Sequence, residues 1–400
     1  MQNDKVKTIM TVETGLDVVI ASKFELFKGK KIGIICNHTS RGKNGRHIVD
    51  LFNESGKCSV TAIFAPEHGY RGSHANGRKI KNDVDSKTGA KIYSLYGKHR
   101  KPTKEMLKNV DMLVYDIQDV GARFYTYIST MSNAMESASA NGIPFVVLDR
   151  PNPIRGDIIE GPLLELKYRS FVGMHPIPVR YGLTAGELAL LICGEGYITN
   201  AVNIDLHIVE MENWTRELWY DETDLPWISP SPNMTNLKTA IVYPGFCLLE
   251  GTDISEGRGT DSPFLKFGAP WIDGQAFARE LNSLDIQGAI FEPSTFTPIS
   301  IPNVAYKPKY ENKLCGGVKI KITDRNDFKP VYAIIRILKK AKQMYQKEFK
   351  WRGTWIDKLY GSDKLRKVIE NNEPLDELFK SWEKDIQQFK EISQQYKIYK

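Results

Sequence analysis

The stretch Val60-Thr61-Ala62-Ile63-Phe64-Ala65-Pro66-Glu67-His68-Gly69-Tyr70-Arg71-Gly72 joins an apolar run to a dense group of polar side chains. The run at 60–64 has the length of a buried strand, and the proline and glycines that follow end it. A carboxylate, an imidazole and a guanidinium therefore lie at the expected carboxyl end of a strand, where open α/β sheets bind their ligands. A capped turn with solvated charges is the alternative interpretation.

Three further apolar runs have the same character, at residues 31–36, 112–117 and 144–148. They alternate with helix-like stretches near 48–52 and 125–141. Near-continuous apolar strands that alternate with helices are typical of a parallel sheet covered on both faces. We therefore expect an α/β fold with a Rossmann-like, doubly wound, mostly parallel sheet.

All four expected strands end in polar residues. These are Asn37 and His38, then Glu67, His68 and Arg71, then Gln118, Asp119 and Arg123, and finally Asp149, Arg150 and Asn152. Because the carboxyl ends of parallel strands meet at one edge of a sheet, we expect the four groups to lie together. Loops held by a rigid sheet are where binding and catalytic sites are usually built.

The strand and helix pattern loosens after about residue 177, and the proline-rich segment 226–234 cannot form regular structure. A chain of 400 residues also exceeds one ordinary core. We therefore expect a Rossmann-like catalytic domain over residues 1–235 and a second, smaller α+β domain over residues 236–400.

The second domain is expected to contain strands at 240–243 and 317–322 and amphipathic helices from about residue 330. It also contains Glu250-Gly251-Thr252-Asp253-Ile254-Ser255-Glu256-Gly257-Arg258-Gly259-Thr260-Asp261, which is dense in carboxylates, hydroxyls and glycines. Glycines allow a ligand to approach the backbone closely, and Arg258 between two of them is free to bind an anion. The segment predicts a second wall of a site, with a polar turn as the alternative.

The composition bounds the class of protein. With 41% hydrophobic and 26% charged residues, the chain is typical of a soluble globular protein. The net charge of +7 is spread over interspersed basic and acidic residues, so we expect no nucleic-acid-binding stripe. No apolar run has the length of a membrane span, and residues 1–14 lack the apolar core of a signal peptide. The five cysteines have neither CxxC nor zinc-finger spacing, and their odd number argues against a complete disulfide framework.

Several common cofactor and catalytic motifs are absent from the sequence. Without a GxGxxG turn or a P-loop, NAD and ATP are not expected, and no cofactor is expected at all. Without HExxH or GxSxG, a zincin or an α/β-hydrolase loses its main support. His38, His68, Glu67 and Asp116 are of metal-binding types, but their spacing selects no metal site, and none is expected.

Glu67 is the candidate general acid. A carboxyl group half buried beside a proline and an aromatic side chain has a raised pKa, which suits it to donate a proton. Glycoside hydrolysis needs such an acid and usually a second group, for which Asp119, Asp253 and Glu256 are the candidates. The separation of the two carboxyl groups would decide between retention and inversion, and a substrate 2-acetamido group offers a third route.

Two further side chains suit a sugar ligand. Asp119 is expected to orient Arg123, which would then bind a carboxylate through two contacts. Tyr125 is expected either to stack on a sugar ring or to pack in the core.

Five segments together resemble one bacterial family. They are Ala-Pro-Glu-His-Gly at 65–69, Asp-Ile-Gln-Asp-Val-Gly-Ala-Arg-Phe-Tyr-Thr-Tyr at 116–127, Leu-Asp-Arg-Pro-Asn-Pro-Ile at 148–154, Ser-Pro-Asn-Met at 231–234, and the segment 250–264. In this order they are similar to the NamZ-like exo-β-N-acetylmuramidase family, formerly a domain of unknown function. The resemblance implies an exo-acting glycosidase that removes terminal N-acetylmuramic acid from peptidoglycan fragments. It also implies an active-site cleft between the two domains, with Glu67 as the catalytic acid.

The implied substrate assigns roles to the polar residues. Its lactyl carboxylate needs a cation, for which the candidates are Arg71, Arg123 and Arg258. Its acetamido group needs a hydrogen-bonding partner, for which the candidates are Asn37, Asn152 and Asn233. The other expected substrate contacts are His38, His68, Tyr125, Asp149, Arg150 and Asp253. The expected catalytic set is Glu67, Asp119 and Glu256.

Location and two alternative functions stay open. Most members of the family are exported, so the resemblance implies a periplasmic or secreted protein whose signal peptide has been removed, and a cytoplasmic location remains an alternative. A non-catalytic protein that binds cell-wall sugars would use the same polar strand ends. A metal-dependent amidase or deacetylase would use His38, His68 and Asp116. The sequence does not give the oligomeric state, the preferred substrate length or the stereochemical outcome.

Overall fold

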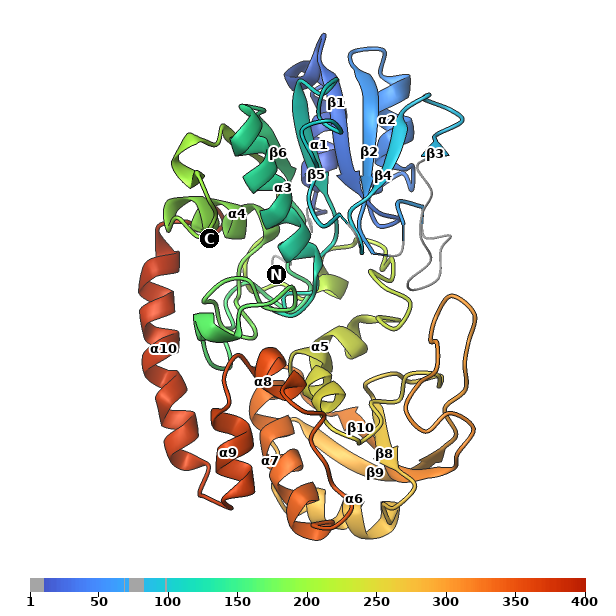
Figure 1. Cartoon of the computed structure of the whole chain (residues 1–400), viewed down its shortest axis with the longest axis vertical. Helices are drawn as coiled ribbons and strands as arrows, with labels where there is room; N and C mark the ends of the chain where they lie inside the picture. The colour runs from blue at the N-terminus through green and yellow to red at the C-terminus, as the bar shows by residue number, and fades with distance from the viewer. Residues whose placement is uncertain (1–10, 68, 72–82, 98) are drawn as a thin grey trace, which may run out of the picture.

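The structure is a computed structural model that describes residues 11–67, 69–71, 83–97 and 99–400. His68, one of the predicted substrate contacts, lies outside the described residues. The described chain forms a larger, mostly parallel sheet and a smaller antiparallel sheet, each with its own helices. Figure 1 shows the larger sheet in the upper half of the molecule and the smaller sheet in the lower half.

The larger sheet has seven strands among the described residues, in the order β3-β4-β2-β1-β5-β6-β7. They are β1 (Lys31–Cys36), β2 (Ser59–Ala65), β3 (Asp83–Val84), β4 (Lys91–Ser94), β5 (Met112–Asp116), β6 (Phe145–Leu148) and β7 (Leu206–Val209). All neighbours pair in parallel except β3 and β4. The chain runs outward from β1 through β2 to β4 and then crosses to β5, so the strand order reverses between β1 and β5.

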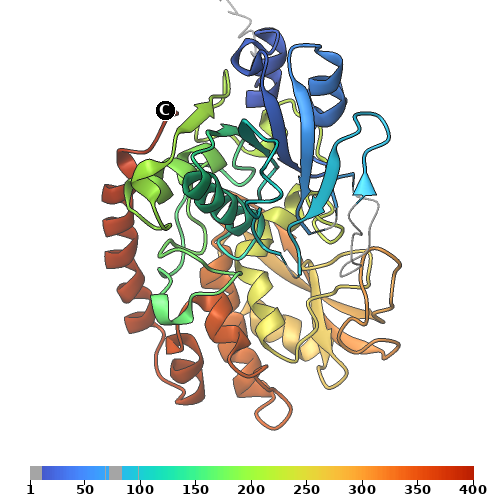
Figure 2. The ribbon, with the colours of Figure 1, turned by 45° about the horizontal axis from the view of Figure 1, so that its top comes forward.

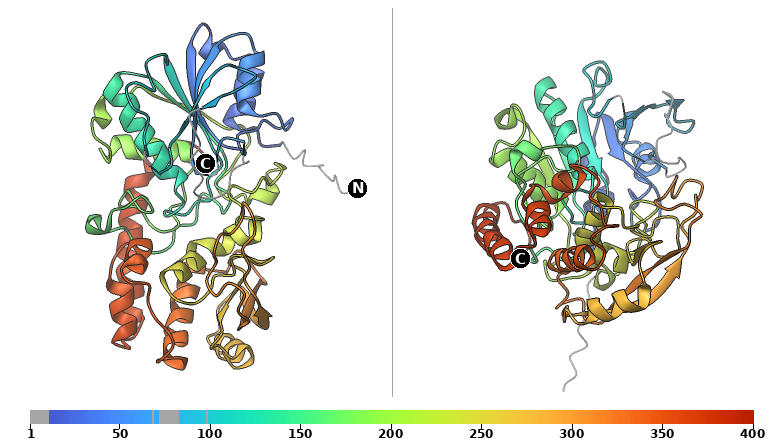
Figure 3. Two further views of the ribbon diagram at one scale, coloured as in Figure 1. Left: turned by 45° about the vertical axis from the view of Figure 1, so that its right-hand side comes forward. Right: turned by 60° about the horizontal axis from the view of Figure 1, so that its bottom comes forward.

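Helices cover both faces of this sheet, as Figure 3 shows. The helices are α1 (Gly15–Ala21) and α2 (Ile48–Glu54) on one face, and α3 (Tyr127–Asn141) and α4 (Ala185–Gly194) on the other. Neighbouring residues of β1 serve opposite faces: Ile34 belongs to the core with α1 and α2, and Ile35 belongs to the core with α3 and α4. Because both faces are buried, the central strands β1, β5 and β6 are apolar over most of their length.

The second part of the chain is built on three antiparallel strands in the order β8-β10-β9. They are β8 (Lys266–Ala269), β9 (Ala289–Phe296) and β10 (Cys315–Ile322), which contains the strand predicted at 317–322. The helices of this part are α5 (Leu237–Phe246), α6 (Gly274–Asn282), α7 (Pro330–Met344), α8 (Trp355–Tyr360), α9 (Lys364–Glu370) and α10 (Asp376–Gln394). Short 3-10 helices occur in both parts of the chain, namely η1 (Glu25–Phe27), η2 (Leu166–Tyr168), η3 (Ala201–Asn203), η4 (Tyr220–Glu222) and η5 (Cys247–Gly251).

The predicted fold class is confirmed. None of the helices in the described ranges is long and apolar enough to cross a membrane.

The strand predicted at 240–243 is wrong, because these residues lie inside α5. A short apolar run does not distinguish a buried strand from a buried helix. Asn236 caps the helix, since its side chain accepts a hydrogen bond from the backbone N–H of Thr239 at 3.1 Å. The domain boundary predicted near residue 236 coincides with this cap, and the division into 1–235 and 236–400 stays a prediction.

The C-terminal segment returns to the larger sheet. Helix α10 runs along one side of the molecule, and the C-terminus lies near the N-terminal half (Figures 1 and 2). The Tyr399 hydroxyl donates a hydrogen bond to Asp149 Oδ2 at 2.8 Å, and the backbone N–H of Ile398 donates to Glu187 Oε1 at 2.9 Å. Both carboxylates are buried, so the last residues of the chain satisfy polar groups in the core of the N-terminal half.

We predict that Tyr399→Phe lowers the free energy of unfolding by about 1–3 kcal/mol. The substitution keeps the ring, which packs edge-on against Trp214 at a centroid distance of 5.0 Å, but removes a donor from the buried Asp149 carboxylate. Urea denaturation measures the loss. Tyr306→Phe is the matched control at a side chain that is 75% exposed, and we expect it to change stability by less than about 0.5 kcal/mol. Equal unfolding midpoints for Tyr399→Phe and the parent would contradict the prediction.

Candidate active site

A cavity of about 580 Å³ lies beyond the carboxyl ends of β2, β4 and β5. Its lining residues from the N-terminal half are Glu67, Tyr96, Gly97, Arg100, residues 124–127 and residues 170–172. Its lining residues from the following segments are residues 231–234, Tyr243, Cys247, Glu250, Arg258, Phe264, Trp355, Lys358 and Leu359. Both parts of the chain therefore form the wall of this cavity.

Four of the predicted site residues line the cavity, namely Glu67, Tyr125, Asn233 and Arg258. Glu67 follows β2, and Tyr125 lies two residues before α3 begins. Asn233 lies in the proline-rich loop before α5, and Arg258 lies in the glycine-rich loop after η5. The sequence had placed these four on separate elements, and the fold brings them to one wall.

Glu67 is half buried, and the parallel pairing of β2 with β4 brings Tyr96 beside it. Burial raises the pKa of Glu67 above its usual value of 4.5. A hydrogen bond from the Tyr96 hydroxyl and the charge of Arg258 oppose this shift, and the charge of Glu250 adds to it. Glu67 therefore keeps its proton to a higher pH than a solvated glutamate does.

Glu250 is the second acidic residue on the wall, and no further acidic residue lines the cavity within the described ranges. Arg258 Nη2 lies 2.8 Å from Glu250 Oε1, and the Arg258 guanidinium stacks over Phe264 at 5.0 Å from the ring centroid. The cavity thus combines a carboxyl group of raised pKa with a carboxylate held in a salt bridge. This arrangement can supply a proton and a negative charge at the same ligand.

Some polar atoms of the wall have no hydrogen-bond partner among the described residues. They are the Tyr125 hydroxyl, Asn233 Oδ1 and Ser170 Oγ. The Asn233 amide is nevertheless oriented, because its Nδ2 donates to the Val304 carbonyl at 2.8 Å. The Tyr125 ring is held edge-on against Tyr243 at 5.8 Å between centroids. A wall with rigid aromatic rings and unused polar atoms suits a ligand that is rich in hydroxyl and amide groups.

Asp119 and Glu256, predicted as catalytic partners, are buried and do not line the cavity. Asp119 accepts hydrogen bonds from the backbone N–H of Gly121 at 2.7 Å and from the Tyr181 hydroxyl, and burial raises its pKa to about 6. Glu256 pairs with Lys309 Nζ at 2.9 Å. Burial opposes the ionisation of Glu256, but Lys309 and Arg258 outweigh it and hold the pKa below its usual value. Protein groups bind both carboxylates, and neither carboxylate lies on the cavity wall.

Arg123 does not line the cavity either, although the sequence suggested that it binds a carboxylate with help from Asp119. Its side chain is 1% exposed. The guanidinium donates to the carbonyl oxygens of Pro162, Ile177, Leu359 and Tyr360 at 2.8, 2.8, 3.1 and 2.6 Å. Arg123 therefore joins the N-terminal half to α8 and has no donor pair left for a ligand.

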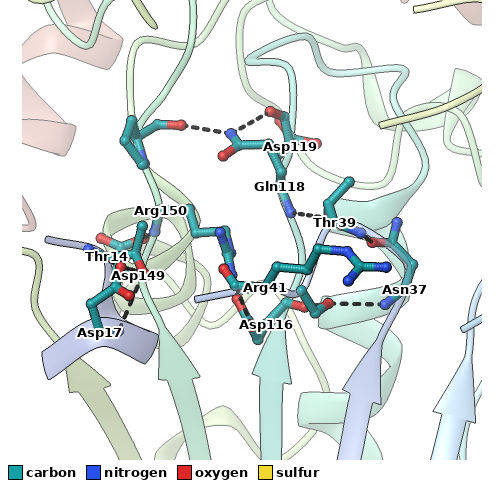
Figure 4. Close-up of polar contacts among 12 residues, drawn as sticks. Thr14, Asp17, Asn37, Thr39, Arg41, Asp116, Gln118, Asp119, Asp149 and Arg150 are labelled. Carbon is teal, nitrogen blue, oxygen red and sulfur yellow. Dashed lines mark hydrogen bonds and ion pairs between the residues drawn. The ribbon is translucent and has the colours of Figure 1, made fainter. Parts of the chain in front are cut away.

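A buried polar network occupies the point where the strand order reverses (Figure 4). Asp116 ends β5 and forms an ion pair with Arg150, whose Nη2 lies 3.0 Å from Asp116 Oδ2. Arg150 Nη2 also donates to the Arg41 carbonyl at 3.0 Å, and the Ser40 hydroxyl donates to the Asp116 carbonyl. This network ties together the loops that follow β1, β5 and β6.

The remaining predicted binding residues have protein partners outside the cavity wall. Asn37 Oδ1 accepts from the Thr39 N–H at 2.8 Å, and His38 Nε2 lies 2.6 Å from the Ser229 carbonyl. Asp149 accepts from the Gly186 N–H at 2.8 Å, and Asn152 donates to the Leu183 carbonyl at 3.0 Å. Arg71 pairs with Asp50 at 3.0 Å, and Asp253 accepts from the Lys350 N–H at 3.0 Å. These side chains hold loops in place, as does Arg150.

Those residues considered for a metal site that the structure describes form no ligand cluster. The described part of the chain contains no cluster of three His, Cys, Asp or Glu side chains that could hold an ion. Asp116 is paired with Arg150, and His38 contacts a backbone carbonyl. His68 lies outside the described residues.

Sequence reasoning missed Tyr96, Arg100, Trp355 and Lys358 on the cavity wall. Glu250 lies within the acidic segment at 250–261, whose predicted site residues are Asp253, Glu256 and Arg258 and do not include it. Tyr96 and Arg100 follow the short strand β4, which is too weakly patterned to recognise. Trp355 and Lys358 belong to α8, one of several C-terminal helices with no distinguishing signal.

Comparisons with known proteins cover nearly the whole chain. The family models described as the N-terminal and C-terminal parts of the exo-β-N-acetylmuramidase NamZ match residues 32–238 and 241–399. The peptidoglycan β-N-acetylmuramidase NamZ of Bacillus subtilis (strain 168) is 44% identical over 389 residues, which are 97% of this chain and 91% of that protein. Two crystal structures of DUF1343 family proteins from Bacteroides fragilis have TM-scores of 0.88 and 0.81 at 36% and 35% identity. Each match covers 98% of this chain and 99% of that chain.

We predict that Arg150→Met lowers the free energy of unfolding by about 3–5 kcal/mol, because it leaves the buried Asp116 carboxylate without its counter-charge. The double variant Asp116→Leu/Arg150→Met removes both charges, so we expect it to lose less stability than Arg150→Met alone. Chemical denaturation of the three proteins gives the comparison. A double variant that is no more stable than Arg150→Met would show that the ion pair is not the source of the loss.

Proposed function

The chain belongs to the NamZ family of exo-β-N-acetylmuramidases, and from this membership we propose that it releases terminal N-acetylmuramic acid from peptidoglycan fragments with Glu67 as the general acid. One observation carries the second half of this proposal. Glu67 is a carboxyl group of raised pKa on the wall of a cavity large enough for a sugar ligand.

The reaction requires a proton at the leaving oxygen. As the bond between the anomeric carbon and the glycosidic oxygen breaks, the Glu67 proton passes to that oxygen. Water supplies the hydroxyl group that the anomeric carbon gains, and its remaining proton returns to an active-site carboxylate. Burial of Glu67 serves this chemistry because it keeps the acid protonated before the bond breaks.

Glu250 is a better second group than Asp119 or Glu256. It lines the cavity with Glu67, whereas the other two carboxylates are bound behind the wall. The Glu250 carboxylate carries the negative charge, and its salt bridge with Arg258 holds that carboxylate in place on the cavity wall. Such a charge suits a base, a nucleophile or a stabiliser of the positive charge that develops on the sugar ring.

The cavity also offers partners for the two groups that distinguish N-acetylmuramic acid. The lactyl carboxylate needs a cation, and Arg100, Arg258 and Lys358 line the cavity. The acetamido N–H needs an acceptor, and Asn233 Oδ1 has no other partner among the described residues. Asn233 and Arg258 are the predicted substrate contacts that this assignment retains.

We further propose that the protein acts in the periplasm or after secretion, because peptidoglycan lies outside the cytoplasmic membrane. Fractionation of the native host followed by immunoblotting tests this location. Recovery of the protein in the cytosolic fraction alone would contradict it.

We predict that Glu67→Gln lowers kcat/KM on the disaccharide N-acetylmuramyl-N-acetylglucosamine by about 10²–10⁴-fold, because glutamine cannot donate the proton. A chromogenic N-acetylmuramide has a good leaving group that needs less protonation. Glu67→Gln should therefore lower kcat/KM for this substrate by a smaller factor. Glu105→Gln makes the same change at an exposed side chain and serves as the control.

Two outcomes would count against this function. Near-native turnover of the disaccharide by Glu67→Gln would remove Glu67 as the acid. Tight binding of the disaccharide by the parent protein without any cleavage would favour a sugar-binding protein instead.

We predict that activity is lost as the pH rises through the raised pKa of Glu67, because only the protonated form donates. The Tyr96 hydrogen bond lowers this pKa, so Tyr96→Phe should shift the alkaline limb of the kcat/KM profile to higher pH. Tyr93→Phe on the same edge of the sheet is the control. If the alkaline limb of the kcat/KM profile lies at the same pH in Tyr96→Phe and in the parent, a group other than Glu67 sets that limb.

A further inference from the structure

An open groove of about 640 Å³ adjoins the cavity, and we call it the outer groove. The two spaces share Gly97, Arg100, Ser170 and Phe171 in their linings. The outer groove adds Lys101 and Arg169 and is more open to solvent than the cavity. A ligand that fills the cavity can therefore continue into the outer groove.

Both walls of the outer groove are fastened to α3. On one wall, Asn133 Nδ2 donates to the Arg100 carbonyl at 3.1 Å. On the other, the Ser129 hydroxyl donates to the Phe171 carbonyl at 2.8 Å. The Arg100 guanidinium lies over the Phe171 ring at 4.7 Å and connects the two walls. These contacts hold the Arg100 and Phe171 segments to α3 and to each other.

The outer groove is basic. Arg100, Lys101 and Arg169 line it, and no acidic residue does so within the described part of the chain. Lys101 pairs with Glu136 of α3 at 3.2 Å, whereas neither Arg100 nor Arg169 forms an ion pair with any described residue. Two guanidinium groups are therefore available to an anion. At the junction with the cavity, the buried Ser170 hydroxyl also has no partner among the described residues.

We propose that the outer groove binds a carboxylate carried by the part of the glycan that remains after cleavage. This inference rests on the proposed function. An exo-acting enzyme holds the terminal sugar at the bond that breaks, and the rest of the glycan must leave through an opening. In an alternating peptidoglycan strand, a neutral N-acetylglucosamine follows the terminal sugar, and the next acidic group belongs to the second muramyl residue. That group is either a free lactyl carboxylate or, where a peptide is attached, a carboxylate of the peptide.

The test measures binding in the Glu67→Gln background, so that the ligands are not cleaved. Calorimetry compares the disaccharide N-acetylmuramyl-N-acetylglucosamine with the tetrasaccharide that contains this unit twice. Only the tetrasaccharide carries a carboxylate beyond the bond that breaks. We expect Arg169→Ala to raise the Kd of the tetrasaccharide by about fivefold and to affect the disaccharide much less. Added salt should reduce this difference between the two ligands, because it screens the charge of Arg169.

Controls separate the sources of the effect. Arg279→Ala removes an exposed arginine on α6 that lines neither the cavity nor the outer groove. It should not change the Kd of the tetrasaccharide relative to that of the disaccharide. A tetrasaccharide with a peptide on its second muramyl residue has no free lactyl carboxylate there. If Arg169→Ala weakens binding of the peptide-free tetrasaccharide more than binding of the disaccharide, the groove recognises the lactyl carboxylate. If only the peptide-bearing tetrasaccharide shows this larger loss, the groove recognises the peptide.

Equal effects of Arg169→Ala on the two peptide-free ligands and on the peptide-bearing one would overturn the inference. The proposed function would survive that result, provided that the parent protein still cleaves the disaccharide. Failure of the parent to cleave or bind the disaccharide would overturn both.

Discussion

The buried ion pair between Asp116 and Arg150 is the interaction on which the arrangement of the site depends. It lies where β1, β5 and β6 end, and Arg150 also holds the loop after β1 through the Arg41 carbonyl. Removing two charges from water costs several kcal/mol, and the cost is offset only when both charges are paired and hydrogen-bonded. The three loops therefore keep one relative arrangement. The cavity lies farther along the same edge of the sheet. Tyr125 on its wall comes after β5, one of the strands that this network joins, and Glu67 follows β2, which pairs in parallel with β1.

Burial favours the protonated form of both Glu67 and Glu256, and the neighbours of each carboxyl group decide the direction of its pKa shift. Burial raises the pKa of Glu67, and a single tyrosine hydrogen bond and a shared arginine do not cancel it. Glu256 is more deeply buried, but Lys309 and Arg258 reverse the shift. The same protein thus keeps Glu67 protonated to a higher pH than usual and holds the buried Glu256 carboxylate charged.

The fold was more predictable than the site. Continuous apolar strands identified the parallel sheet, because burial on both faces leaves no room for polar residues. Polar residues at strand ends indicated the edge of the sheet on which the cavity lies, but of those that the structure describes only Glu67 lines the cavity. Arg123 and Arg150 look equally suited to bind an anion. In the structure Arg123 donates to backbone carbonyls, and Arg150 pairs with the Asp116 carboxylate. A local pattern cannot separate these cases, because a buried polar group needs a partner whether that partner is a ligand or the chain itself.

The sequence by itself determined the order of β1, α2, β2, β5, α3 and β6, the sheet edge at which polar residues gather, and Glu67 as the candidate acid. Periodicity and turn residues act over a few positions, so they can be read without knowledge of distant contacts. Only the tertiary structure decided that Glu250 rather than Asp119 or Glu256 shares the cavity with Glu67. It also brought Tyr96 and Arg100, which follow β4, and Lys358 of α8 to the wall. Glu250 and Lys358 reach the wall through packing between segments more than 150 residues apart, and no local pattern contains the solvent exposure and charge neighbours that result.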